Sequence, residues 1–568
     1  MTQEERHRIV SEDYADLLIE NIGDTSILEL FPDATINPIN FLLSVVHVPV
    51  EIVTNQLIQE IGYEVLPALL GLVSQSSLEA SGIIRLRQIP NFNFHGQGVL
   101  IGLLDTGIDY TNPIFQYEDG TTRITTIWDQ SIESDNPPEG MLYGTEYTRE
   151  QINQALQSEN PLEIVPSMDE NGHGTMVAGI AAGRPVPESD FYGVADAAEI
   201  VVVKLKPAKK YLKNFFFIPE DVPCYEENDI SFALEYLLNV SIRLNKPIAI
   251  CIAVNTSQSA HDGRGTLSGN IALKALTTGT AIVIAAGNEG SARRHYSGIP
   301  DRITGFDTVE LNVGENERGF SMELWAQNPG IFSVDILTPS GEFVPRIEAN
   351  TNEYREITFV FEETIIHLDY QFLETQSGDQ LILFRFDRPT PGIWTFRVYQ
   401  DGDLNLRFDI WLPMEGFISD NTFFVRSDPY TTVLTLGTIP VPLTVTAYNH
   451  ADDSLFLASS RGYSRSGAIT PQAAAPGVNV IGPTLNKTFQ SFSGTSVSAA
   501  HTVGVAAMIL EWGIVNGNLP NMSTVNLRKL IERGARRNIG MVYPNRDWGY
   551  GILDIYNVFD SLRAGVPI

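Results

Sequence analysis

The chain has 568 residues, of which 43% are hydrophobic and 19% charged, so it can build several folded domains and is not mainly disordered. Its 37 Lys and Arg against 69 Asp and Glu give a net charge of −32, which disfavours nucleic acid and anionic membranes as partners. Two cysteines, Cys224 and Cys251, are too few for a disulfide framework, and no C-x-x-C pair suggests zinc.

Residues 1–78 predict a first unit that mixes helix and strand. Its first residues are polar with no signal-type apolar run, and no run in the chain approaches about 18 apolar residues. We therefore expect synthesis in the cytoplasm and no membrane span. Helical periodicity covers Tyr14–Ile22 and Val53–Ile61, whereas Phe41–Val50 is strand-like. The small polar stretch Val73–Ser77 is typical of an exposed loop that proteases cleave.

Residues 79–297 change to an α/β pattern. The continuous apolar runs Val99–Leu104, Ile200–Val203 and Ala281–Ala285 are typical of strands buried on both faces of a parallel sheet. Helical stretches such as Asp229–Asn239 lie between them. This alternation predicts a doubly wound sheet with its ligands at the carboxyl ends of the strands.

Residues 298–424 change to a period of two, which predicts an inserted all-β domain, a β-sandwich of jelly-roll type. The α/β pattern resumes over 425–568 with Val433–Leu436, Val478–Ile481 and a small-residue helix over Ser496–Trp512. The expected strands of the insert are Val309–Val313, Phe320–Trp325, Phe332–Leu337, Ile357–Phe361, Leu381–Phe386, Trp394–Tyr399 and Leu406–Leu412.

Three segments carry residues suited to catalysis. Asp105 follows a buried strand, at the sheet edge where sites are built. His173 is flanked by glycines and precedes a small-residue helix, and Ser496 stands where a Gly-Thr-Ser turn meets a helix N-terminus. Any one of these alone would be weak evidence, because an isolated serine at a helix start is usually an N-cap.

Together the three residue types supply nucleophilic catalysis. A serine hydroxyl needs a base, a histidine can take its proton and return it to a leaving amine, and a buried carboxylate fixes the imidazole. The oxyanion needs fixed donors, for which the candidates are the Ser496 N–H and the side-chain amide of Asn288.

The chain order Asp, His, Ser and the Asn288 segment resemble the subtilase family of serine proteases over residues 79–297 and 425–568. The resemblance implies that Asp105 orients the base, His173 is the base and acid, and Ser496 is the nucleophile. It also implies that Asn288 donates to the oxyanion. The metal-binding positions of the family cannot be assigned to residues of this chain, so we predict no calcium site and no cofactor.

The basic segment Lys204–Lys210 and the β-rich insert are similar to a narrower group, the clostridial Csp-type germination proteases. That resemblance implies a prodomain over 1–78, acting in cis as chaperone and inhibitor with its C-terminal end in the cleft. Autoprocessing is then expected near residues 73–81. The implied protein substrate is the zymogen of a spore cortex-lytic enzyme, in a spore-associated setting. Two alternatives stay open: a pseudoprotease that senses germinants or scaffolds a partner, and a coat protein that uses the β domain for adhesion.

Two departures from the family pattern concern the active site. Ala500 stands four residues after Ser496, where the family usually has proline. Ala253, Val254 and Asn255 align with the strand that binds substrate beside the P1 residue, where many subtilases carry Ser-Leu-Gly. An Asn side chain in place of a glycine hydrogen predicts a narrower groove and a restricted set of substrates.

For the remaining histidines and charged segments of interest, a structural or solvated role is the preferred interpretation. We expect His501 to be a packed structural residue, and His261 and His295 to be solvated loop residues. Asp169–Glu170 could hold a cation, but solvated charge is the preferred interpretation. The basic tract Lys204–Lys213 could contact the insert or an acidic substrate, and a solvated face is preferred there too.

Overall fold

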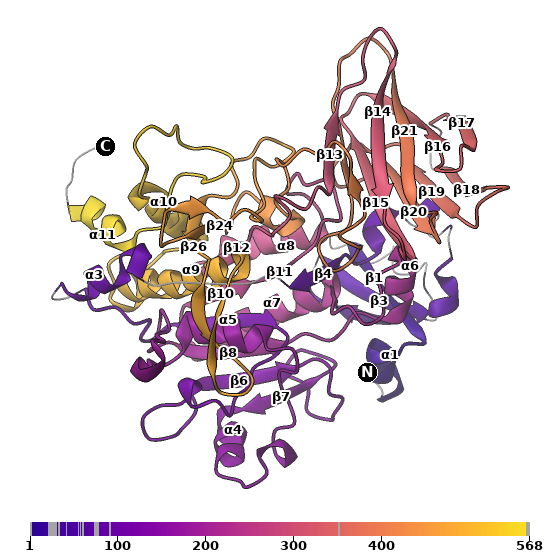
Figure 1. Ribbon diagram of the computed structural model, residues 1–568. Helices are drawn as coiled ribbons and strands as arrows, with labels where there is room; N and C mark the ends of the chain where they lie inside the picture. Colours follow the sequence, from indigo (N-terminus) through magenta and orange to yellow (C-terminus); the bar gives the residue numbers. More distant parts are fainter. Residues whose placement is uncertain are drawn as a thin grey trace.

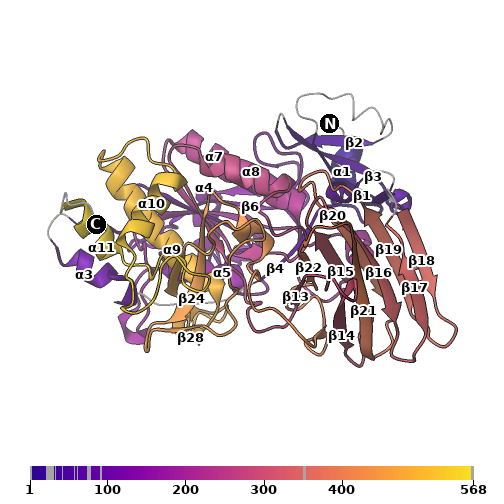
Figure 2. The ribbon, with the colours of Figure 1, turned by 90° about the horizontal axis from the view of Figure 1, so that it is seen from above.

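The structure of the protein is a computed structural model with an α/β core, a β-rich unit at one side and a small N-terminal sheet (Figures 1 and 2). The described residues are 3–20, 31, 34–40, 42–54, 56, 58–59, 62–72, 79–89, 92–349 and 353–563.

The core is built on a sheet whose six central strands run parallel. In spatial order these are β24 (Leu443–Asn449), β12 (Thr280–Ala285), β10 (Ile248–Ile252), β5 (Leu100–Asp105), β8 (Glu199–Lys204) and β6 (Ile124–Asp129). Along β5, Ile101 and Leu103 join one hydrophobic cluster, whereas Leu100 and Leu104 join another. Both faces of the sheet are therefore covered, and the parallel sheet expected from the apolar runs is confirmed.

Short strands extend the core sheet at its two edges. They are β7 (Thr145–Thr148) beside β6, with β25 (Ser454–Leu455) and β26 (Ala473–Pro476) beside β24. No strand was predicted at β24, and the strand predicted at Val433–Leu436 is wrong. That stretch leads into a 3₁₀ turn at Thr435–Thr438.

Helices pack on the two faces of the core sheet. α5 (His173–Ala182) and α9 (Thr495–Leu510) contribute to one apolar cluster, and α7 (Glu227–Leu244) and α8 (Thr266–Ala275) to the other. Among the described residues one helix, Thr495–Val515, has the length and apolarity of a membrane span, but 89% of its most apolar window is buried inside the fold. Further helices among the described residues of the core and its flanks are α3 (Ile83–Arg87), α4 (Arg149–Leu156), α6 (Lys210–Phe216), α10 (Thr524–Gly534) and α11 (Ile555–Arg563).

The N-terminal residues form α1 (Gln3–Val10) and the antiparallel sheet β1 (Tyr14–Glu20), β3 (Leu43–Pro49) and β2 (Thr35–Pro38). The predicted helix over Tyr14–Ile22 is wrong where it is described. Ala15, Leu17 and Ile19 pack into one cluster and Leu18 into another, so the run is buried on both faces and tertiary pairing decides for strand. The strand-like reading of Phe41–Val50 is confirmed by β3, and the predicted helix Val53–Ile61 falls partly outside the described residues.

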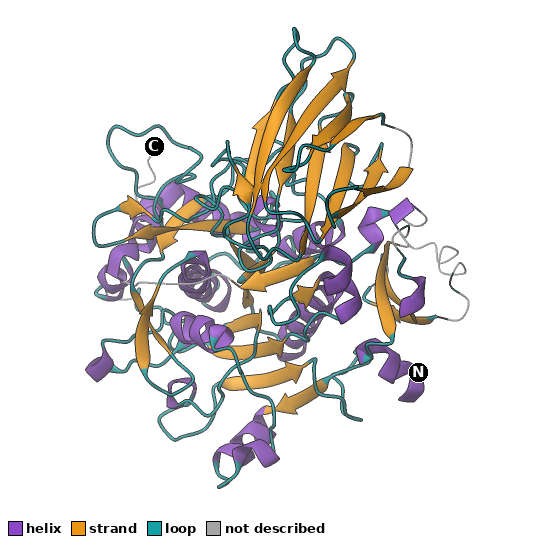
Figure 3. Cartoon of the chain, turned by 45° about the vertical axis from the view of Figure 1, so that its right-hand side comes forward, coloured by secondary structure: helices purple, strands orange, loops and turns teal. Residues whose placement is uncertain are grey.

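The β-rich unit consists of two antiparallel sheets around one apolar cluster (Figure 3). Each of the seven predicted strands overlaps an observed one, and β13 straddles the expected boundary at 297/298. One sheet has the order β13 (His295–Gly298), β22 (Phe408–Trp411), β15 (Gly319–Ala326), β20 (Gln380–Asp387), β19 (Ile365–Gln371) and β18 (Glu353–Thr358). The other has the order β17 (Phe343–Ile347), β16 (Ile331–Leu337), β21 (Gly392–Asp401), β14 (Phe306–Val313) and β23 (Phe423–Phe424).

Candidate active site

Asp105 is the last residue of β5, in the middle of the parallel sheet. The residue is 1% exposed. Asp105 Oδ1 lies 2.7 Å from His173 Nδ1 and accepts the Thr106 N–H at 2.8 Å. The carboxylate is therefore held toward the imidazole at the edge of the sheet where sites are built.

His173 is the first residue of α5, and the glycines around it explain its position. Gly172 adopts a left-handed φ of 94°, which turns the chain into the helix. A Cβ at Gly174 would lie 2.2 Å from the Gly107 carbonyl oxygen, so only glycine lets the helix approach the Asp105 loop. The outer ring nitrogen of His173, Nε2, lies 3.3 Å from Ser496 Oγ.

Ser496 is the second residue of α9 and has no exposed surface. Its hydroxyl also lies 3.3 Å from the Ala253 carbonyl oxygen. Its N–H belongs to the first helical turn, whose amides have no partner within the helix and carry the positive end of the helix dipole. The structure thus brings Asp105, His173 and Ser496, far apart in sequence, into one hydrogen-bonded line.

Asn288 lies in the turn after β12, beside the start of α9. Its Oδ1 accepts the Thr495 N–H at 3.2 Å, and the Thr495 hydroxyl lies 3.3 Å away. Because Oδ1 is engaged as an acceptor, the donor end of the amide is the one that can face a substrate oxygen.

Asp169 has a role in this site that was not predicted from the sequence. Its Oδ1 accepts the Thr106 hydroxyl at 2.8 Å and the Gly172 N–H at 2.8 Å, and its Oδ2 accepts the N–H and hydroxyl of Thr175 at 2.8 and 2.7 Å. It is 1% exposed, so the expectation of solvated charge is wrong for Asp169, whereas Glu170 is exposed. One carboxylate therefore ties the loop of Asp105 to the helix start of His173.

The predicted substrate-binding residues adjoin the nucleophile. β11 (Val254–Asn255) pairs with β4 (Leu69–Leu72), which also pairs with β9 (Tyr225–Glu226), so a strand of the first unit lies between two strands of the core. Asn255 is fully buried, donates Nδ2 to the Ala285 carbonyl at 3.0 Å and accepts the Leu436 N–H at 3.0 Å. Its side-chain amide therefore links two segments of the core. The narrower substrate groove beside the P1 residue stays a prediction.

The basic tract does not form a solvated face, so that expectation is wrong. Lys206 and Lys209 are buried, and Lys209 Nζ lies 2.6 Å from Asp16 Oδ1 of the first unit. Lys206 Nζ lies 2.7 Å from Asp229 Oδ2. Burial alone would raise the pKa of Asp16, but Lys209 and the neighbouring His47 lower it below its usual value. The charges of this tract hold the first unit against the core.

His261, His295 and His501 are buried rather than solvated. His261 and His295 each stack on Trp411, at centroid distances of 4.2 and 4.8 Å, and each is 1% exposed. The expectation of solvated loops is wrong, because an aromatic side chain of the β-rich unit covers both rings. His501 is packed as expected, with Nε2 2.6 Å from Ser81 Oγ, and burial lowers its pKa to about 3.

Both cysteines are free and buried. Burial raises the pKa of the Cys224 thiol to about 12, which removes its nucleophilic form at neutral pH. Within the described ranges, no three imidazole, thiol or carboxylate side chains converge as a metal site would require.

Comparisons with known proteins agree with this geometry. The family model for the subtilase family matches residues 96–313 and 428–551. The PII-type proteinase of Lacticaseibacillus paracasei is 22% identical over 533 residues, which cover 83% of this chain and 26% of that protein. The subtilisin-like protease SBT3.6 of Arabidopsis thaliana is 22% identical over 474 residues, which cover 73% and 56%. The chain thus spans between about a quarter and just over half the length of these relatives.

A solved structure, the CspB protease of Clostridium perfringens, superposes with a TM-score of 0.76 at 30% identity. The match covers 86% of this chain and 99% of that protein.

Proposed function

The chain belongs to the subtilase family of serine peptidases, and we propose that it cleaves peptide bonds with Asp105, His173 and Ser496 as its catalytic triad. The observation that carries the proposal is the unbroken line of contacts from the Asp105 carboxylate through both ring nitrogens of His173 to the Ser496 hydroxyl. The 3.3 Å His–Ser distance is typical of a site before its reacting geometry tightens.

The geometry supports an acyl-transfer mechanism. Ser496 Oγ attacks the substrate carbonyl while His173 Nε2 takes the hydroxyl proton, and Asp105 stabilises the resulting imidazolium through Nδ1–H. The oxyanion receives the Asn288 amide and the Ser496 N–H. His173 then gives its proton to the leaving amine, and water hydrolyses the acyl-enzyme by the same steps in reverse.

Residues 1–78 are proposed to be a prodomain that folds with the core and inhibits it in cis. The support is β4, which occupies the position of a substrate strand beside Val254 and Asn255, and the burial of Ser496. Cleavage is proposed within the stretch that follows Leu72. The predicted site near residues 73–81 lies mostly outside the described residues, which resume at Glu79.

Purification of the wild type beside Ser496→Ala tests both proposals. N-terminal sequencing should find a new terminus between residues 73 and 81 in the wild type and an intact chain in the variant. Two intact chains would refute autoprocessing, and equal cleavage in both would assign the cut to another protease.

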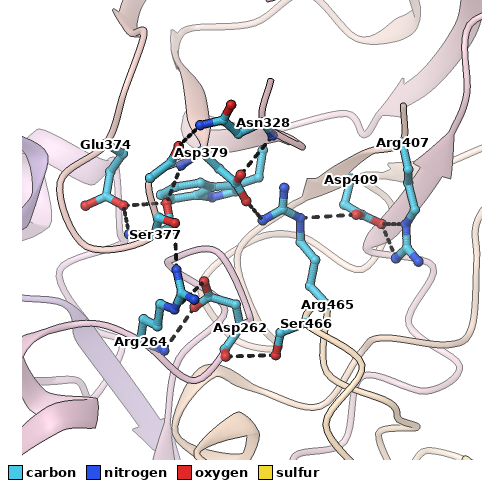
Figure 4. A network of polar contacts seen from close by, with 12 residues as sticks. Asp262, Arg264, Asn328, Glu374, Ser377, Asp379, Arg407, Asp409, Arg465 and Ser466 are labelled. Carbon is cyan, nitrogen blue, oxygen red and sulfur yellow. Dashed lines mark hydrogen bonds and ion pairs between the residues drawn. The ribbon is translucent and has the colours of Figure 1, made fainter. Parts of the chain in front are cut away.

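The β-rich unit is proposed to be a jelly-roll insert, 298–424, that clamps a core made of 79–297 and 425–568. Arg465 of the core has Nη1 2.5 Å from Asp379 and Nε 3.3 Å from Asp409 of the insert (Figure 4). Arg264 Nη1 also donates to the Ser377 carbonyl at 2.8 Å. Arg465→Met should therefore increase nicking by an added protease, whereas Arg388→Met, an exposed change within the insert, should not.

We further propose that the substrate is the zymogen of a spore cortex-lytic enzyme, and that the protein is made in the cytoplasm and becomes spore-associated. The support is the similarity to the CspB protease, whose match covers 86% of this chain and 99% of that protein. Incubation of such a zymogen with the wild type should yield a discrete shortened product, absent with Ser496→Ala. A wild type that binds the zymogen without cutting it would favour the alternative, a pseudoprotease that senses germinants or scaffolds a partner.

A further inference from the structure

A cavity of about 530 Å³ is lined by residues that take no part in the proposed active site. Its walls come from α3, α5, α9, β27 (Val480–Pro483) and the loop that follows α5. An apolar cavity of about 150 Å³ can hold one benzene molecule, so this one has room for a larger organic molecule. The side chains that matter for a ligand are the apolar Ile83, Ile180, Val480 and Ile481 and the polar Arg87 and His501.

His501 leaves one polar atom of the cavity wall unpaired. The residue is fully buried, and its Nε2 lies 2.6 Å from Ser81 Oγ, whereas its Nδ1 has no hydrogen-bond partner among the described residues. Burial lowers the pKa of His501 to about 3, so the ring is neutral at pH 7 and carries a single N–H. Because a serine hydroxyl can donate or accept, Nδ1 can carry that proton. A buried polar atom without a partner is costly, so a ligand acceptor at Nδ1 is favoured.

Arg87 brings a positive charge to the same wall. Its Nε donates to the Phe94 carbonyl at 3.1 Å, and its Nη2 donates to the Val194 carbonyl at 2.5 Å and lies 3.3 Å from Asp196 Oδ1. Its Nη1 makes no hydrogen bond to any residue that the structure describes. The guanidinium is therefore held in place while one of its nitrogens keeps its donors for a ligand.

Close packing at Gly504 brings the guanidinium and the imidazole together. Gly504 follows His501 by three residues on α9, so the two positions share one face of the helix. A Cβ at Gly504 would lie 2.4 Å from Val194 Cβ, so the missing side chain lets Val194 pack against this face. Arg87 is bonded to the carbonyl of that same Val194. Both donors of the cavity therefore lie on one side of α9.

We infer that this cavity binds an aliphatic monocarboxylate. The carboxylate accepts hydrogen bonds from Arg87 Nη1 and His501 Nδ1, which is the charge-assisted pairing that guanidinium favours, and the carbon chain packs on the isoleucine and valine side chains. Asp190 also contributes to the lining and is exposed, so its charge stays solvated and disfavours a ligand with a second negative charge.

Such a ligand contacts α3, which follows the proposed cleavage stretch, and the two helices whose first turns carry His173 and Ser496. The cavity is therefore a site for an effector of the fold around the active site. The inference does not depend on the proposed peptidase activity, because binding is measured without catalysis.

Calorimetric titration of the full-length Ser496→Ala chain tests the inference. Octanoate should bind at least about tenfold more tightly than 1-octanol, because hydrogen bonds to a charged group are added to the same carbon chain. Suberate, the dicarboxylate of the same length, should bind more weakly than octanoate. Equal affinities for octanoate and 1-octanol, tighter binding of suberate, or no saturable binding of octanoate would overturn the inference.

Variants in the Ser496→Ala background assign the binding to this cavity. Arg87→Met and His501→Met should each lower the affinity for octanoate by about tenfold and leave that for 1-octanol unchanged. Arg85→Met is a matched control that should change neither affinity, because Arg85 lies on the same helix but stacks on Tyr556, with Cζ 3.7 Å from the ring centroid.

Ile481→Trp keeps the test decisive if a variant at the buried His501 fails to fold. It fills the cavity and removes none of the polar contacts, so it should abolish the binding of both octanoate and 1-octanol. Octanoate affinities in Arg87→Met and Ile481→Trp that equal that of the parent chain would place the bound ligand elsewhere and refute the site.

Discussion

Replacing Asp16 by asparagine tests whether buried charge holds the first unit on the core. Asp16 Oδ1 lies 2.6 Å from both Lys209 Nζ and His47 Nδ1, and Asp16 and Lys209 are 0% and 2% exposed. Removing one partner of such a pair leaves a buried charge uncompensated, at a cost of about 3–5 kcal/mol. Since about 1.4 kcal/mol is a factor of ten, the dissociation constant of the cleaved first unit should rise by roughly 100- to 4,000-fold.

Gel filtration of the processed protein measures this effect. The wild type should keep the cleaved first unit bound, whereas Asp16→Asn should release it at micromolar concentration. Glu12→Gln is a matched control, because Glu12 also contacts the tract, through the Lys210 N–H at 2.8 Å, but is exposed. Combining Asp16→Asn with Lys209→Met should recover part of the loss. Co-elution of Asp16→Asn identical to the wild type would refute the reasoning.

Three further changes test the site and its surroundings. Asn288→Ala should lower kcat by about 10²–10³ with little change in KM in a peptide assay, and a change confined to KM would exclude an oxyanion role. Asp169→Asn should lower kcat by about 10²-fold, because Asp105 and His173 would be misplaced. The control Glu170→Gln should leave kcat unchanged, and equal kcat values for the two variants would contradict the positioning role of Asp169. Burial raises the pKa of Glu226 to about 8 from 4.5, so its contribution to stability is complete below pH 4.5 and lost as pH rises through 8. Glu226→Gln should therefore melt progressively higher than the wild type as pH rises from 5 to 8.5, and a pH-independent difference in melting temperature would count against this.

The parts of the site that could be predicted from the sequence are those set by local chain geometry. Gly174 beside His173 marks a place where a helix start approaches another backbone, and Gly494 before Ser496 has a φ of 144° that favours glycine. Such requirements leave a signature in sequence. The continuous apolar run that ends at Asp105 likewise indicates a strand that is buried on both faces of a sheet.

The parts that could not be predicted depend on partners distant in sequence. Lys206 and Lys209 look solvated until Asp16 supplies an opposing charge from nearly two hundred residues away. His261 is covered by a tryptophan of the β-rich unit. Asp169 gains its role from Thr106 in the loop after β5 and from Thr175 in the first turn of α5. Local patterns hold no information about such pairings, because charge and polarity favour solvent until a partner is specified.

The strand β1 shows the same limit for the fold. Its apolar spacing fits a helix as well as a strand, and pairing with β3 decides between them. Seven strands of the β-rich unit were located because alternation and turn residues are local signals, whereas β17 and β19 were missed.

The central claim is that Asp105, His173 and Ser496 act as one unit, and single and combined alanine variants test it most directly. Rates of autoprocessing should fall in His173→Ala and Ser496→Ala to the same residual level as in the triple variant, because removing one member disables the unit. If the fold-losses in rate of the single variants multiply in the triple variant, the three residues act independently and the central claim is wrong. A His173→Ala chain that autoprocesses at the wild-type rate would also contradict it.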